Sequence, residues 1–253
     1  MRLAGKKIVV TGASGIAAAG ARAAARENAA VFVISLDSTE CRELTEEVDG
    51  AGFAVADLTD EEQAEGAFES ARSRLGSIDG LFAVAGASGR PFGDGPIDEM
   101  SLAALVETFR VNGGPAFLAA REAVREMRGH GGSVVLVSSV LVTNPSPEHF
   151  STHGYAAAKG SIHALTTALA SRYAADEIRV NCLAPGLVQT PMSERAASAP
   201  DILAYATRKQ PLARGLLDPE SVASAAVFLL SDESAMITGQ VLAVDGGWGV
   251  TEA

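Results

Sequence analysis

Short runs of apolar and β-branched residues alternate along the chain with longer segments whose apolar residues recur every three or four positions. The short runs have the length of buried strands, and the longer segments have the period of helices. The predicted strands are Lys7–Thr11, Ala30–Ser35, Ala51–Ala56, Gly80–Ala85, Ser133–Ser138, Arg179–Ala184 and Gln240–Val244. The predicted helices lie near residues 17–28, 39–48, 60–75, 101–128, 155–175 and 219–231.

This alternation predicts βαβ units, which form a parallel sheet with helices on both faces. Several strand runs are apolar almost throughout, as strands buried on both faces are. With right-handed crossovers, the predicted fold class is α/β, a Rossmann-like doubly wound parallel sheet that binds ligands outside the carboxyl ends of its strands. The 253 residues show no internal repeat or linker and predict a single domain, residues 1–253.

Composition and charge exclude several classes of protein. The net charge of −11 argues against nucleic-acid binding, which depends on basic surface. No apolar stretch is long enough for a transmembrane helix, and the N-terminus lacks the apolar region of a secretory signal. The two cysteines, Cys41 and Cys182, lie far apart without metal-ligand spacing. We therefore expect a cytoplasmic protein with reduced thiols, no metal site and no membrane contact.

A glycine-rich turn, Thr11-Gly12-Ala13-Ser14-Gly15, follows the first predicted strand and opens the first predicted helix. Glycine allows a tight turn, and the N–H groups at a helix N-terminus can bind a pyrophosphate. Many strand–helix turns need glycine for backbone geometry alone, so this turn by itself leaves both interpretations open.

Tyr155 and Lys159 lie four residues apart, and a Ser138-Ser139 pair ends an apolar run upstream, with Ser139 sixteen residues before Tyr155. Residues at i and i+4 share one helix face, so an ammonium can lie beside a phenol and favour its ionised form. Ser139, on another element, could hydrogen-bond the oxygen of a reacting carbonyl or alcohol. The alternative is a surface helix that carries an unrelated Tyr and Lys. The other motifs of the chain are needed to choose between these two interpretations.

Taken together, these motifs resemble those of the short-chain dehydrogenase/reductase family, and the resemblance covers essentially the whole chain. The matching residues occur in the family's order. They are Thr11-Gly12, Gly15-Ile16, Asp57, Asp79, Ala85-Gly86, Asn112, Ser139, Tyr155, Lys159, Pro185-Gly186, Thr190 and the ending 239–247. The resemblance implies hydride transfer between a nicotinamide cofactor and a secondary alcohol or the corresponding ketone.

The resemblance also implies four catalytic residues. Tyr155 is expected to be the general acid in reduction and the general base in oxidation. Lys159 is expected to lower the pKa of Tyr155 and to contact the nicotinamide ribose. Ser139 is expected to hold the substrate oxygen, because the second serine of such a pair is the usual catalytic one. Asn112 is expected to help order a water-linked proton relay.

The expected cofactor contacts lie at the carboxyl ends of the strands. Asp57 and Leu58 are expected beside the adenine, and the Pro185-Gly186 turn near the nicotinamide amide. The full expected set is Gly12, Ser14, Gly15, Ile16, Ser35, Asp37, Asp57, Leu58, Ala85, Gly86, Asn112, Tyr155, Lys159, Pro185, Gly186, Val188 and Thr190.

The end of the second predicted strand bears on the choice between NAD(H) and NADP(H). NAD binders place an acidic residue there to bind the ribose, whereas NADP binders use a nearby Arg for the phosphate. Here the strand ends at Ser35-Leu36-Asp37. Ser35 leaves room for a phosphate, but Asp37 is close enough to repel it or to reach the ribose, and Arg42 is the nearest cation. We expect NAD(H) to be favoured over NADP(H).

The chain departs from the family pattern at three places. The glycine turn is one residue shorter than usual and has Ala17 in place of a third glycine. The family's Asn-Asn-Ala-Gly reads Ala83-Val84-Ala85-Gly86, which loses an amide that usually braces the sheet. The segment from Ser139 to Tyr155 is three residues longer than in many relatives. These changes bear on cofactor affinity and pocket shape, because no catalytic side chain is lost.

The chain length and C-terminal pattern resemble the tetrameric branch of the family, which implies a homotetramer. Trp248 and the long helices near 101–128 and 155–175 could cover shared apolar surfaces; alternatively, Trp248 closes only its own core. Segments 88–96 and 187–212 follow strand ends and are expected to face the substrate.

Two classes of function remain open. The altered glycine turn favours a non-catalytic relative that binds a nucleotide or a partner, but the intact catalytic set favours an enzyme. Among enzymes, a 3-oxoacyl-thioester ketoreductase competes with a sugar, polyol or other small-alcohol dehydrogenase. Arg90 or Arg195 could pair with an anionic substrate. The sequence further suggests three residues that line the entrance of the substrate pocket, namely His149, Phe150 and His153.

Overall fold

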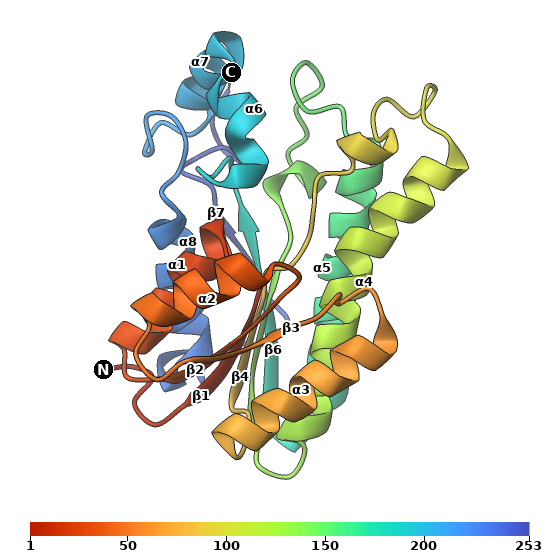
Figure 1. Ribbon diagram of the computed structural model, residues 1–253. Coiled ribbons are helices and arrows are strands. Elements are labelled where there is room, and N and C mark those ends of the chain that lie inside the picture. The colour runs from red at the N-terminus through yellow and green to blue at the C-terminus, as the bar shows by residue number, and fades with distance from the viewer. Residues whose placement is uncertain (253) are drawn as a thin grey trace.

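The sheet is parallel throughout and has the predicted topology. The computed structural model describes residues 1–252, and residue 253 of the expected domain lies outside the described residues. Seven strands follow the order β3-β2-β1-β4-β5-β6-β7 (Figure 1). They are β1 (Lys7–Thr11), β2 (Ala30–Ser35), β3 (Gly52–Val55), β4 (Gly80–Ala83), β5 (Gly132–Val137), β6 (Ile178–Pro185) and β7 (Val241–Val244). Each overlaps a predicted strand, and the predicted doubly wound fold is confirmed.

The helices lie on both faces of the sheet (Figure 1). One face is covered by α1 (Gly15–Arg26), α2 (Ser38–Glu47) and α8 (Pro219–Leu230), and the other by α3 (Glu61–Leu75), α4 (Leu102–Met127) and α5 (His153–Tyr173). Along β1, Ile8 and Val10 pack into the first core, and Val9 packs into the second. Burial of both faces explains why the strand runs are almost wholly apolar. No helix within residues 1–252 is both long and apolar enough to cross a membrane.

Two short helices were not predicted: α6 (Glu194–Ala197) and α7 (Pro200–Lys209). Figure 1 shows both beyond the strand ends, at the top of the view. The first is a single turn, and Tyr205 of the second packs with Trp248 in a small cluster separate from the two main cores. Helix α7 buries only Ile202, Tyr205 and Ala206, and α6 buries only Ala196, so their apolar faces are much shorter than those of the helices that pack on the sheet.

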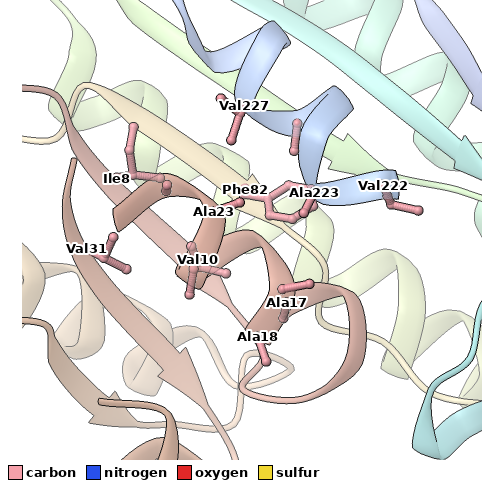
Figure 2. Packing of buried hydrophobic residues seen from close by; sticks show 14 of the residues in the cluster. Ile8, Val10, Ala17, Ala18, Ala23, Val31, Phe82, Val222, Ala223 and Val227 are labelled. Atoms are coloured by element: carbon pink, nitrogen blue, oxygen red, sulfur yellow. The ribbon is translucent and has the colours of Figure 1, made fainter. Parts of the chain in front are cut away.

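Helix α1 packs very closely on the sheet because its inner face consists of small residues. Figure 2 shows Phe82 of β4 lying between this face and α8, near Ala23 and Ala223. A Cβ atom on Gly20 would lie only 2.4 Å from the Phe82 ring. The alanine-rich sequence of α1 is thus a packing requirement, and it holds the start of α1 at the carboxyl edge of the sheet.

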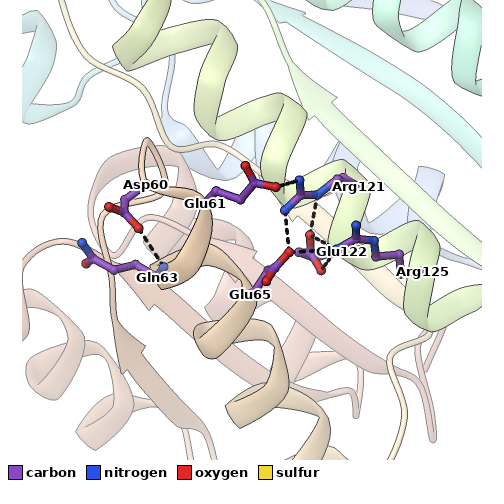
Figure 3. Close-up of polar contacts among 7 residues, drawn as sticks. All are labelled: Asp60, Glu61, Gln63, Glu65, Arg121, Glu122 and Arg125. Atoms are coloured by element: carbon purple, nitrogen blue, oxygen red, sulfur yellow. Dashed lines mark hydrogen bonds and ion pairs between the residues drawn. The ribbon is translucent and has the colours of Figure 1, made fainter.

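On the other face, an ion-pair network joins α3 to α4 (Figure 3). Arg121 of α4 contacts Glu65 of α3 at 3.1 Å and Glu122 at 2.6 Å, and it also pairs with Glu61. Isolated surface pairs contribute little to stability, but a network shares the cost of ordering its side chains. The network fixes α4, the helix that carries Asn112.

Candidate active site

The crevice at the carboxyl ends of β1 and β4 is braced by a threonine. These strands are neighbours, but the chain continues from them in opposite directions across the sheet, which is where doubly wound folds bind ligands. The buried hydroxyl of Thr11 accepts hydrogen bonds from the backbone N–H groups of Val84 at 3.0 Å and Ala85 at 3.1 Å. Thr11 therefore ties the two strand ends together at the point where the expected Asn brace is missing.

The glycine turn leads directly into α1. Gly12 and Gly15 have positive φ angles of 97° and 51°. Ser14 is the N-cap residue, yet its side chain makes no capping hydrogen bond. A Cβ on Gly12 would lie 3.0 Å from the Cβ of Ala17, so the alanine that replaces the third glycine packs directly over this turn. The turn keeps half-buried Ser14, Gly15 and Ile16 at the helix N-terminus, where N–H groups favour a phosphate.

Asp37 lies just beyond the carboxyl end of β2. Its Oδ1 accepts hydrogen bonds from the N–H groups of Thr39 at 2.7 Å and Glu40 at 3.0 Å, so it caps α2. Ser35, the last residue of β2, is half-buried, whereas Asp37 is exposed. One carboxylate oxygen of Asp37 is thus committed to the helix cap.

Asp57 and Leu58 follow β3 at the same edge. The N–H of Thr59 donates to Asp57 Oδ1 at 2.9 Å, and this bond holds the pKa of the Asp57 carboxyl below its usual value. Leu58 is buried. The cap of α3 is Asp60, which accepts from Gln63 N–H at 2.9 Å, so Asp57 is not the helix cap.

Asn112 is fully buried in the middle of α4 and holds the chain that follows β4. Its Nδ2 donates to the carbonyl groups of Ala87 at 2.9 Å and Thr108 at 3.0 Å, and its Oδ1 accepts from Ala87 N–H. A Cβ on Gly86 would lie 2.8 Å from Asn112 Oδ1 and 3.3 Å from Lys159 Nζ. The amide is therefore engaged by backbone, and only glycine fits between Asn112 and Lys159.

The serine pair divides into two roles. Ser138 Oγ donates to the carbonyl of Lys159 at 2.8 Å and is buried. Ser139 Oγ accepts from Leu141 N–H at 3.2 Å, and the same hydroxyl interacts with the Tyr155 phenol and lowers its pKa in part. Ser138 thus ties β5 to α5, whereas Ser139 faces the phenol.

Tyr155 and Lys159 lie together on α5, but their titration differs from expectation. Lys159 Nζ is 5.8 Å from the centroid of the Tyr155 ring and donates to the carbonyl of Val137 at 3.0 Å. Burial raises the pKa of Tyr155 to about 12, although the neighbouring Ser139 hydroxyl lowers it in part. Burial likewise lowers the pKa of Lys159 to about 8. In this structure, desolvation outweighs the expected lowering of the Tyr155 pKa by Lys159.

The Pro185-Gly186 turn is fixed by a buried glutamine that the sequence did not single out. Gln210 Oε1 accepts from Leu187 N–H at 3.0 Å, and its Nε2 donates to the Leu187 carbonyl at 2.8 Å. A Cβ on Gly186 would lie 2.6 Å from Gln210 Oε1. Gln210 follows α7 directly, so this helix and the turn are rigidly connected.

Val188 and Thr190, two further residues of the expected cofactor site, follow the Pro185-Gly186 turn. Val188 pairs with Leu217 in an isolated parallel bridge. A Cβ on Gly15 would lie 2.8 Å from the Thr190 side chain, so Thr190 packs against the glycine turn. The structure therefore brings the two ends of the expected cofactor site into contact.

The long insert before α5 packs on the C-terminal segment. Trp248 is 1% exposed, and its Nε1 donates to the Asn144 carbonyl at 3.1 Å. Its ring lies 6.0 Å from that of Phe150 and 5.5 Å from that of Tyr205. The suggestion that Trp248 covers a surface shared between subunits is wrong, because this side chain is already buried within its own chain.

Other residues expected at the entrance contact one another. Arg90 Nη2 donates to the His149 carbonyl at 3.3 Å, and the His149 ring lies 4.7 Å from that of Tyr205. His153 is exposed, and its Nδ1 accepts from Ile97 N–H at 3.0 Å. The segment after β4, the insert and α7 therefore meet on one side of the crevice.

Comparison with known proteins gives the class. Residues 10–249 match a family model described as "Enoyl-(Acyl carrier protein) reductase". The cis-4-hydroxycyclohexanecarboxylate dehydrogenase of Sinomonas cyclohexanicum is 36% identical and is matched over 95% of both chains. A Xanthobacter autotrophicus relative, named inactive 2-(S)-hydroxypropyl-CoM dehydrogenase 2, is 36% identical over 90% of this chain and 98% of its own. A solved short-chain type dehydrogenase/reductase from Mycobacterium ulcerans is 27% identical, with a TM-score of 0.91 over 100% of this chain and 93% of its own.

The chain therefore belongs to the short-chain dehydrogenase/reductase family. It is an NAD(P)-dependent oxidoreductase that acts on a secondary alcohol or the corresponding ketone. The site fits a nicotinamide cofactor, because the glycine turn places the start of α1 at the crevice, where its backbone N–H groups can bind a pyrophosphate.

Proposed function

We propose that Tyr155 moves the proton of this reaction and that Ser139 and Lys159 assist it. The bound cofactor supplies or accepts the hydride. In reduction, the phenol of Tyr155 donates its proton to the carbonyl oxygen of the substrate, while Ser139 Oγ holds that oxygen. In oxidation, the same tyrosine accepts the alcohol proton. The observation that carries the proposal is that three groups lie together: the Ser139 hydroxyl lowers the pKa of the Tyr155 phenol in part, and Lys159 Nζ is 5.8 Å from the centroid of the Tyr155 ring.

We assign Asn112 a supporting role in the same reaction. Its contacts with Ala87 keep the chain after Gly86 in place beside Lys159. The water-linked relay expected from the family pattern would then start from this fixed segment. Replacing Asn112 by Leu should lower turnover and disturb the cofactor dissociation constant together; a change in neither would contradict the assignment.

The competing proposal is a non-catalytic relative, and one relative is named inactive. The retained Ser139, Tyr155 and Lys159 favour an enzyme. The test is the nicotinamide absorbance change with a broad panel of secondary alcohols and ketones. Turnover that Tyr155→Phe abolishes supports the enzyme, whereas tight cofactor binding without turnover across the panel supports the alternative.

We propose NAD(H) over NADP(H). The groove beside Ser14 is lined by Glu40 and Glu43, and Arg22, which also lines it, is paired with Glu47 at 2.6 Å. A phosphate on the adenosine ribose would meet this acidic surface and Asp37 nearby, and like charges repel. We assign the remaining contacts to Gly12, Ser14, Gly15, Ile16, Ser35, Asp37, Asp57, Leu58, Ala85, Gly86, Pro185, Gly186, Val188 and Thr190.

Catalytic efficiency with each cofactor tests this choice. We expect a higher kcat/KM with NAD(H) than with NADP(H), and we expect Asp37→Ala to reduce the difference in kcat/KM between the two cofactors. A strong preference for NADP(H) that is lost in Arg42→Ala would contradict the proposal, because Arg42 would then be holding the phosphate.

For the substrate, we propose a small secondary alcohol that carries an acidic group. Burial holds the pKa of Arg90 below its usual value, and the charge of Arg195 adds to this effect while that of Asp94 opposes it. Two guanidinium groups therefore belong to the segments that are expected to face the substrate. The Sinomonas relative is named for a hydroxycyclohexanecarboxylate. Arg90→Met and Arg195→Met should each raise KM for this hydroxy acid and leave cyclohexanol oxidation unchanged. Equal effects on both substrates, or faster turnover of an acetoacetyl thioester, would contradict the proposal.

We propose a homotetramer in the cytoplasm, with residues 1–253 as one domain. Strand β7 is at the edge of the sheet, and Val241 and Leu242 are 40% and 41% exposed. Phe117 of α4 is 51% exposed, and such apolar surface on an edge strand and a long helix favours association. Light scattering that reports a monomer at assay concentration would contradict the tetramer.

A further inference from the structure

Helix α5, which carries Tyr155, begins without a capping side chain of its own. The first N–H groups of a helix have no partner within it, and the N-cap side chain commonly accepts from one of them. The N-cap of α5 is Thr152, but its side chain makes no capping hydrogen bond. Its hydroxyl is instead 3.5 Å from the carbonyl of Phe150.

A carboxylate from a distant segment supplies the missing acceptors. Asp94 Oδ1 accepts from Gly154 N–H at 2.8 Å, and Oδ2 accepts from Tyr155 N–H at 2.9 Å. Asp94 is only 6% exposed. A buried carboxylate that receives two N–H groups at a helix N-terminus makes charge-assisted hydrogen bonds, which are stronger than neutral ones.

The backbone around Asp94 extends the same connection. The carbonyl of Gly95 accepts from His153 N–H at 3.2 Å, and Ile97 N–H donates to His153 Nδ1 at 3.0 Å. Residues 94–97 therefore bind three successive residues at the start of α5, the last of which is Tyr155.

Two glycines make room for this carboxylate. A Cβ on Gly89 would lie 2.6 Å from Asp94 Oδ2, and a Cβ on Gly154 would lie 2.9 Å from Asp94 Oδ1. The N–H of Asp94 donates to the Gly89 carbonyl at 3.1 Å, which closes the turn that presents the side chain. The site is thus closely packed around the carboxylate, and a side chain at either glycine would displace it.

We propose that Asp94 is a positioning residue for the reaction: by binding the first turn of α5, it fixes the Tyr155 phenol relative to Ser139. The inference rests on the proposed role of Tyr155. A displacement of about 1 Å in a reacting group can cost on the order of 100-fold in rate. Asp94 also belongs to the segment after β4 that is expected to face the substrate. This segment is therefore hydrogen-bonded directly to the helix that bears the acid–base group.

The test compares Asp94→Ala and Asp94→Asn with Asp218→Ala. Asp218 caps α8 through the N–H of Glu220 at 3.0 Å and serves as a matched control, because α8 carries none of the proposed site residues. Since Asp218 also lines the groove beside Ser14, kcat is measured at a saturating cofactor concentration. The assay uses the alcohol that the panel shows to be turned over fastest. Three quantities are measured: kcat, the cofactor dissociation constant, and hydrogen exchange in the first turn of α5.

We expect Asp94→Ala to lower kcat by roughly 10- to 100-fold with a cofactor dissociation constant within about twofold of wild type. Asp94→Asn keeps one acceptor and should recover part of kcat. Exchange in the first turn of α5 should rise in the Asp94 variants only, and Asp218→Ala should keep kcat within about twofold.

Wild-type kcat in Asp94→Ala, or an equal loss of kcat in Asp218→Ala, would overturn the inference. If Asp94→Ala does not fold, Asp94→Asn decides by the same criteria. Tyr155→Phe distinguishes failure of the proposed function from failure of the positioning role of Asp94. If Tyr155→Phe remains active, the proposed function fails; if it is inactive while the Asp94 variants turn over normally, only the role of Asp94 fails.

Discussion

The Nζ atom of Lys159 lies 5.8 Å from the centroid of the Tyr155 ring, and both side chains titrate away from their usual ranges. As the pH rises, Lys159 loses its proton near pH 8, and Tyr155 keeps its proton to about 12. In the protein alone, therefore, Lys159 is the first of the pair to lose its charge, and the phenol is protonated at neutral pH.

Because Lys159 loses its proton near pH 8 in the folded protein, we predict that the free energy of unfolding changes with pH and that Lys159→Met removes this change. The folded pKa of Lys159, about 8, is below its ordinary value of 10.5, so between these pH values the unfolded chain binds more protons than the folded protein. The free energy of unfolding should therefore rise with pH across this window. From pH 7 to 9.5, wild type should gain on the order of 2 kcal/mol relative to Lys159→Met. Urea unfolding at each pH measures it.

Stopping at pH 9.5 separates Lys159 from Tyr155, whose raised pKa of about 12 lowers stability only above its ordinary value near 10. Parallel stability curves for wild type and Lys159→Met would contradict the assignment of the titration near pH 8 to Lys159.

Thr11 should matter to both stability and cofactor binding. Thr11→Val keeps the shape of the side chain but leaves the N–H groups of Val84 and Ala85 without their acceptor. An unsatisfied buried donor costs about 1–3 kcal/mol, and we expect a loss of that size in the free energy of unfolding, together with weaker cofactor binding. Thr11→Ser retains the hydroxyl and should stay close to wild type. Equal stability of the two variants would show that the strand ends do not need this brace.

The sequence predicted the fold because its signals are local and repeated. The inner strands β1, β2, β4, β5 and β6 are buried on both faces, and the long helices bury residues at intervals of three or four positions, so the pattern alone specifies alternating elements. The two helices that the sequence did not predict are α6 and α7, which cover the strand ends and not the sheet. Tyr205 of α7 packs on Trp248, which is distant in the sequence.

The proposed site was predictable as a set of residues but not as a set of contacts. Tyr155 and Lys159 share a helix face, so their proximity follows from spacing. Asp94 binds the N–H of Tyr155, which lies 61 positions away in the sequence, and Gln210 binds the N–H of Leu187, which lies 23 positions away. No local sequence pattern links residues that are so far apart. The Tyr155 pKa was misjudged because spacing reveals a neighbouring charge but not the depth of burial that opposes its effect.

Gly86 should tolerate no side chain. In Gly86→Ala, the new Cβ would lie 2.8 Å from Asn112 Oδ1 and 3.3 Å from Lys159 Nζ, so one of these buried groups must move. We expect turnover to fall by about tenfold or more, as for other displacements of site residues. Gly66→Ala in α3 is the matched control, because nothing lies within 4 Å of its new Cβ. It should keep full activity and gain slightly in stability, since Ala favours a helix. Equal activity of the two variants would contradict a tight site at Gly86.

The most direct test of the account is the turnover of Tyr155→Phe, followed by nicotinamide absorbance with the best substrate of the panel. The substitution removes the phenolic oxygen that interacts with Ser139 and keeps the ring beside Lys159. We expect a folded protein with an unchanged cofactor dissociation constant and a turnover lower by roughly 10²–10⁴-fold, the usual contribution of a positioned acid–base group. Turnover close to that of wild type would contradict the account, because Tyr155 would then not move the proton.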